Sequence, residues 1–78
     1  MTEEGRTTRL ADEYLSHVGS TGRPVRVYTY LSEIRPGASV RLAVEYERAV
    51  KRELVARQRA GSVQVMPDRN GELCWQPA

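Results

Sequence analysis

The amino-acid sequence predicts a small α+β domain in which three to four helices are followed by a C-terminal β-hairpin. Apolar side chains recur at helical spacing up to residue 60. The remaining residues alternate between apolar and polar around Asn70-Gly71, a dipeptide that favours a hairpin turn. The chain has 78 residues, which fits one domain, and domains of this size are only marginally stable alone. We therefore expect a disordered start at 1–6 and one folded unit at 7–78.

The first helix is expected at residues 7–18. Thr7 or Thr8 can cap it, because a hydroxyl accepts a hydrogen bond from an orphan N–H group. The flexible residues from Gly19 onward end the helix. Its apolar face needs cover, either from the rest of the domain or from the same helix of a second copy, so a homodimer through this helix is an expected partner arrangement. The positions on that face are Leu10, Ala11, Tyr14, Leu15 and Val18.

The segment 25–34 fits either a helix or a strand. Its β-branched and aromatic residues suit a strand. We favour a helix, because a strand would end its apolar face on Glu33. Pro24 suits the first helical position, and Arg35-Pro36-Gly37 ends the segment. The positions that match the helical template are Val27, Tyr30, Leu31 and Ile34.

Residues 39–60 contain no Gly or Pro, so one long helix capped by Ser39 is possible. On a helical wheel Glu47 falls in the middle of the apolar face, and an unpaired buried carboxylate is costly. We therefore expect a break at Glu47, with helices at about 39–46 and 48–60. The alternative is one helix with Glu47 at the edge of a narrow apolar face. The apolar positions are Val40, Ala43, Val44, Val50 and Leu54.

The C-terminal residues read as two strands joined by a tight turn. Gly61 suits a helix C-cap, and turn-forming residues separate the alternating segments 62–66 and 72–76. Cys74 is out of phase with the apolar positions and is expected to face outward as a plain small residue. The apolar positions that share one phase are Val63, Val65, Leu73 and Trp75.

This order of elements resembles a winged helix-turn-helix domain over residues 24–76. Winged-helix regulators similarly show Leu-Ala in the second helix, a basic recognition helix ending near a Leu, and a Gly before the first wing strand. The resemblance implies DNA binding, with 48–60 as recognition helix and 68–71 as wing tip. The interval from Ala43 to Leu54 is about one turn shorter than the common pattern. The matching residues are Ala38-Ser39-Val40-Arg41-Leu42-Ala43, Val50-Lys51-Arg52-Glu53-Leu54 and Ala60-Gly61-Ser62-Val63-Gln64-Val65.

Basic charge concentrates in the second part of the chain. The formal net charge of +2 divides into −1 for residues 1–33 and +3 for residues 34–78, and all basic residues but Lys51 are arginines. Four arginines of the segment 39–60 lie within about 40° on a helical wheel, opposite the apolar face, with Lys51 and Arg57 beside them. Guanidinium groups pair with phosphates and read guanine in the major groove of double-stranded DNA. The expected DNA-binding residues are Arg48 and Arg52, nearest the bases, and Arg41, Lys51, Arg59 and Arg69, on phosphates.

Other functions have less support in the sequence. One Cys and one His exclude a zinc finger and an intrachain disulfide. No cofactor, metal or catalytic motif is present, so we expect no enzyme activity. No apolar run approaches a membrane span and the N-terminus does not resemble a signal peptide, so a cytoplasmic protein with no membrane partner is expected. The main alternative is a protein–protein adaptor or assembly module that uses the arginines and the hairpin edge. Tyrosines and Trp75 are expected in the core.

Overall fold

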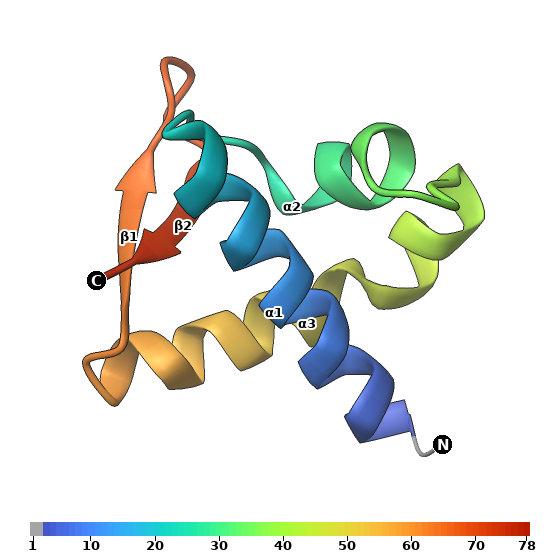
Figure 1. The fold of residues 1–78 in the computed structure, drawn as a ribbon, viewed down its shortest axis with the longest axis horizontal. Coiled ribbons are helices and arrows are strands. Elements are labelled where there is room, and N and C mark those ends of the chain that lie inside the picture. The colour runs from blue at the N-terminus through green and yellow to red at the C-terminus, as the bar shows by residue number, and fades with distance from the viewer. Residues whose placement is uncertain (1–2) are drawn as a thin grey trace.

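The computed structural model describes residues 3–78, in which three helical segments precede a two-stranded antiparallel hairpin, as the sequence predicts (Figure 1). The helices pack around one core, with a Cα radius of gyration of 11.5 Å. Within this described part of the chain, no helix has the length and apolarity needed to cross a membrane. The elements are α1 (Glu3–Thr21), α2 (Val27–Thr29), the π-helical turn η1 (Tyr30–Ile34) that continues it, α3 (Val40–Arg59), β1 (Val63–Pro67) and β2 (Leu73–Pro77).

Helix α1 begins at Glu3, before the expected cap at Thr7 or Thr8, and so includes residues 3–6, where we expected no structure. Residues 1–2 of that segment lie outside the described residues. The helix ends at Thr21, so Gly19 does not end it as expected. The early turns are held against α3, where the Arg6 guanidinium lies 5.1 Å from the centre of the Tyr46 ring. Such a cation–π contact is attractive, so it stabilises the helical conformation of the first turns of α1.

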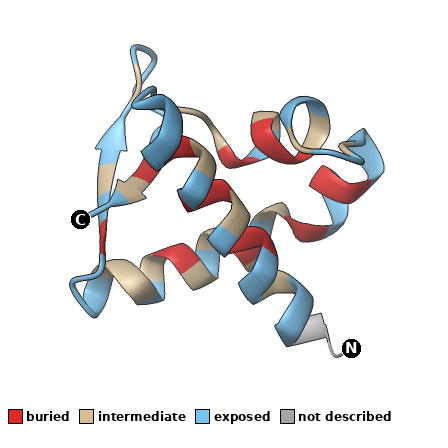
Figure 2. Cartoon of the chain, in the orientation of Figure 1, coloured by how far each residue is buried: buried red, intermediate tan, exposed pale blue. Residues whose placement is uncertain are grey.

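The apolar face of α1 packs inside its own domain. The five predicted positions on that face, from Leu10 to Val18, are each no more than 9% exposed. Figure 2 shows these and the other buried residues gathered where the helices meet and at the base of the hairpin. The expected homodimer therefore stays a prediction. Because the apolar face of α1 is already covered, such a dimer would have to form through a different surface.

The segment at 27–34 is helical, which confirms the favoured interpretation. Pro24 does not begin the helix, because Arg26 is its N-cap with an extended backbone conformation. Two contacts with distant residues hold the chain before α2 in place. The Tyr14 hydroxyl donates to the carbonyl of Val25 at 2.5 Å, and the Arg26 guanidinium pairs with Asp68 at 2.7 Å.

Helix α3 is continuous from Val40 to Arg59, so the predicted break at Glu47 is wrong. Ser39 caps it as expected, since its hydroxyl oxygen accepts from the N–H of Leu42 at 3.0 Å. The break was inferred from a misplaced apolar face, because Val40 and Val44 are 60% and 71% exposed. Glu47 lies at the edge of the true buried face, where Lys51 pairs with it at 3.4 Å. The buried residues of α3 are Leu42, Ala43, Tyr46, Val50 and Leu54.

The hairpin has the predicted turn, and each of its two strands begins and ends one residue later than predicted. Val65 lies opposite Trp75, and Gly71 has a φ of 81°, so Asn70-Gly71 occupies the turn. Cys74 is 2% exposed, which corrects the expectation that it faces outward. Burial raises the pKa of the Cys74 thiol.

Candidate nucleic-acid interface

Helix α3 presents four exposed arginines on the side that faces away from the core. Their Cα positions lie within about 40° around the helix axis, roughly opposite Val50 and Tyr46, which are buried. Among residues 5–78, none of the four forms an ion pair with a carboxylate. We call this surface the arginine face, and its members are Arg41, Arg48, Arg52 and Arg59.

Continuity of α3 is what aligns the arginine face. Arg41 and Arg59 are separated by five helical turns, or about 27 Å of rise. A break at Glu47 would have changed the direction of residues 40–46 relative to residues 48–59. Since the helix is unbroken, the guanidinium groups extend along one side of it and concentrate positive charge on one line.

Unlike the four residues of the arginine face, Lys51 and Arg57 are paired with carboxylates. Lys51 is paired with Glu47, one helical turn before it, at 3.4 Å. Arg57 lies on the packed side of α3 rather than beside the arginines, and pairs with Asp12 at 2.6 Å and with Glu53 at 2.9 Å. Arg57 therefore joins α3 to α1. The expectation that it lies beside the arginines was wrong, because at 100° per residue it is about 160° from Arg41 around the helix axis.

The hairpin tip carries Arg69 in an exposed position. The turn is held by Asp68, whose carboxylate accepts from the N–H groups of Asn70 at 2.8 Å and Glu72 at 3.0 Å. The same carboxylate pairs with Arg26, and this hydrogen bond is the main cause that lowers the pKa of Asp68. The tip is thus tied to the start of α2, and Arg69 extends from an anchored loop.

Two valines border the arginine face. Val40 and Val44 lie one helical turn apart and have the most exposed large apolar side chains among residues 3–78. Sequence reasoning placed both in the core and did not consider them as site residues. One signal pointed the other way: leaving both out of the apolar face removes the conflict at Glu47 without a break in the helix.

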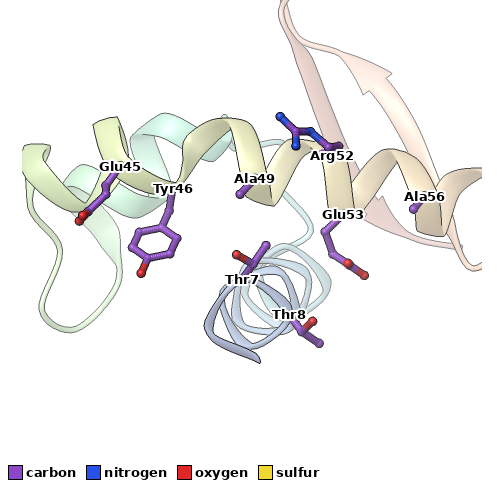
Figure 3. Close-up of a pocket in the computed structure, with 8 residues that line it drawn as sticks. All are labelled: Thr7, Thr8, Glu45, Tyr46, Ala49, Arg52, Glu53 and Ala56. Carbon is purple, nitrogen blue, oxygen red and sulfur yellow. The ribbon is translucent and has the colours of Figure 1, made fainter. Parts of the chain in front are cut away.

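The other side of α3 is different in charge and shape. Where α1 crosses α3, a groove of about 570 Å³ opens beside Thr7 and Ala49 (Figure 3). In this view Tyr46 and Glu53 extend on the α1 side of α3, whereas the Arg52 side chain points away from the threonines. Glu45, Glu53 and Arg52 all line this groove, so both signs of charge meet there. No group of three or more His, Cys, Asp or Glu side chains within the described residues forms a metal site.

Most aromatic side chains serve the core. Tyr14 and Tyr30 pack edge to face with ring centres 5.7 Å apart, and His17 lies against Tyr30 at 5.3 Å. Trp75 is 2% exposed and its indole N–H donates to Gln58 at 3.3 Å. Tyr28 is partly exposed, at 37%. The predicted core role of Trp75 is confirmed.

Comparison of the chain with protein-family models, with curated proteins and with solved structures finds no match. The chemistry of this chain's own residues is therefore what indicates its function.

Proposed function

We propose that this domain binds double-stranded DNA through the arginine face, in the manner of a winged helix-turn-helix regulator. The observation that carries the proposal is the alignment of four exposed arginines on one side of a 20-residue helix, with no carboxylate partner among residues 5–78. The order of elements supports it: α1, the α2–η1 segment and α3 correspond to three helices, and β1 with β2 corresponds to the wing. This assignment makes α3 the recognition helix, and not a separate helix at 48–60.

The continuous helix changes the expected role of each arginine. Recognition helices read bases with their N-terminal turns. The expectation that Arg48 and Arg52 lie nearest the bases assumed a helix that starts at residue 48. Since α3 starts at Val40, we assign Arg41 and Arg48 to the base edges. Arg52, Arg59 and Arg69 then contact phosphates, and Lys51 contacts one by exchanging its partner Glu47 for the phosphate.

Salt dependence is the property that identifies such an interface. Each neutralised phosphate releases counterions and adds about −0.9 to the slope of log affinity against log salt concentration. Four to six contacts therefore predict a slope of about −4 to −5. The phosphate contacts require no change in the fold, because the guanidinium groups are already exposed.

The test is binding of the purified domain to a random-sequence duplex of about 20 base pairs, followed by fluorescence anisotropy at about 50 and 200 mM salt. We expect binding at the lower salt concentration and a loss of roughly two to three orders of magnitude at the higher one. Absence of duplex binding at about 50 mM salt contradicts the proposal, because electrostatic binding is strong there.

A protein–protein adaptor is the second candidate function. The observation that favours it is the exposure of Val40 and Val44 beside the arginines, since interfaces with proteins combine apolar and arginine side chains. An adaptor of this kind would bind an acidic protein surface and show no affinity for duplex DNA. The same anisotropy measurement therefore separates the two candidates.

A further inference from the structure

Val44 is the most exposed large apolar side chain among residues 3–78, at 71%. It belongs to a small domain whose other helical apolar residues are mostly buried, so its exposure has no explanation in the packing of the fold. Val40, one turn earlier on α3, is 60% exposed. Both lie in the first two turns of the helix.

The position of Val44 relative to the arginines is set by helix geometry. Arg41 precedes it by three residues and Arg48 follows it by four, and residues at these spacings are neighbours on a helix surface. Val44 therefore lies between two guanidinium groups, and Arg41 and Arg48 are about 10 Å apart along the axis. This distance corresponds to about three base pairs at 3.4 Å each.

An apolar group between two guanidinium groups matches the groups that a thymine next to guanines presents in the major groove. Thymine presents a C5-methyl group there, and guanine presents the two acceptors that arginine reads. Apolar side chains contact the thymine methyl favourably, because the contact removes both groups from water.

We propose that Val44 contacts a thymine C5-methyl group, so that the arginine face selects duplexes with a thymine adjacent to the guanines read by Arg41 and Arg48. This proposal rests on the proposed DNA binding, which it makes sequence-specific. The arginines provide affinity for any duplex, and Val44 provides the preference for the methyl group.

The charge around Val44 favours DNA over an apolar protein partner. Arg41, Arg48 and Arg52 have no carboxylate partner among residues 5–78, so an uncharged protein surface would leave them unpaired on contact. A polyanion satisfies them and brings its bases within reach of the valine.

The experiment compares two duplexes that differ only in methyl groups. A duplex is first selected from a random pool for tightest binding by the parent domain, and is then synthesised with deoxyuridine in place of every thymidine. This exchange removes the C5-methyl and preserves the hydrogen-bonding edges. We expect the parent to bind the thymidine duplex about fourfold more tightly, which corresponds to about 0.8 kcal/mol for one methyl group.

Val44→Ala should reduce this ratio to near one while it binds the uridine duplex as the parent does. Its far-UV circular dichroism and melting temperature should match the parent, because Val44 is exposed. Arg52→Ala is the matched control, since it should weaken binding to both duplexes and leave their ratio unchanged.

Each outcome distinguishes this inference from the proposed function. Equal affinity of the parent for both duplexes, or an unchanged ratio in Val44→Ala, overturns the role of Val44 and leaves DNA binding intact. Failure of the parent to bind any duplex at about 50 mM salt overturns the proposed function and this inference with it. In that case Val44 and the arginines belong to a protein interface or face solvent.

Discussion

The phenol oxygen of Tyr14 accepts a hydrogen bond from the backbone N–H of Trp75 at 3.0 Å, and the same hydroxyl donates to the carbonyl of Val25 at 2.5 Å. One side chain of α1 therefore joins β2 to the segment that leads into α2. The N–H of Trp75 points to the edge of β2 that does not face β1, so Tyr14 also satisfies an edge group of the hairpin. This link orients the hairpin relative to the helices.

Tyr14→Phe should lower the free energy of unfolding by about 1–3 kcal/mol. The ring stays, but the N–H of Trp75 and the carbonyl of Val25 lose a buried partner, and unsatisfied polar groups carry that cost. Urea denaturation measures it. Tyr28→Phe is the control, because Tyr28 is partly exposed and its change should stay within about 0.5 kcal/mol. Equal effects of the two substitutions would contradict the role assigned to Tyr14.

The free energy of unfolding should fall at alkaline pH because of Tyr14. Burial, the largest cause, raises the pKa of Tyr14 from 10.0 to about 12. The folded state therefore retains the phenol proton that the unfolded state loses, and this contribution is complete below pH 10 and disappears as the pH rises toward 12. The loss should reach about 2–3 kcal/mol. Denaturation measured from pH 9 to pH 12 should show a larger loss in the parent than in Tyr14→Phe, which keeps the smaller loss due to Tyr30, whose pKa burial also raises.

Acid should weaken the link between the hairpin tip and α2. The hydrogen bond from Arg26, as the largest cause, lowers the pKa of Asp68 below its ordinary value of 3.8. A lowered carboxyl pKa stabilises the folded state above the unfolded pKa, and this contribution is lost as the pH falls through the folded value. Melting temperatures from pH 6 to pH 2 should therefore decline more steeply in the parent than in Asp68→Asn. Parallel curves for the two proteins would count against the ion pair.

Gly71→Val should destabilise the hairpin by about 1 kcal/mol or more, because a β-branched residue disfavours positive φ. A Cβ atom at Gly71 would meet nothing within 4 Å, so the cost comes from the backbone and not from a clash. Gly71→Asn is the matched control, since Asn tolerates the left-handed region and should cost less. A melting temperature unaffected by valine would argue against this turn.

Arg48→Ala/Arg52→Ala should melt like the parent but lose duplex binding at least tenfold. Exposed charges contribute little to stability, whereas each base or phosphate contact contributes to affinity. Arg9→Glu is the charge-matched control: it lowers the net charge by the same two units from an exposed position on α1. Anisotropy measurements on the same duplex should separate the two variants. Equal losses would mean that net charge, and not the arginine face, determines binding.

Local patterns in the sequence were sufficient to predict the order of the helices and strands. Ser39 as a cap, Asn70-Gly71 as a turn and the helical spacing of Leu10 and Tyr14 each depend on residues close together in the chain. The alignment of Arg41 with Arg59 follows from helical periodicity alone. These features were predictable because the hydrogen bonds and spacings behind them are local.

Tertiary packing decided which side of α3 is buried. A helical wheel shows that apolar residues cluster but not which neighbours cover them, and α1 and η1 cover Leu42 and Tyr46 while Val40 and Val44 stay exposed. The same cause explains the continuity of the helix at Glu47. Burial of Cys74 and the pairing of Arg57 with Asp12 likewise depend on residues distant in the chain, which only the folded arrangement brings together.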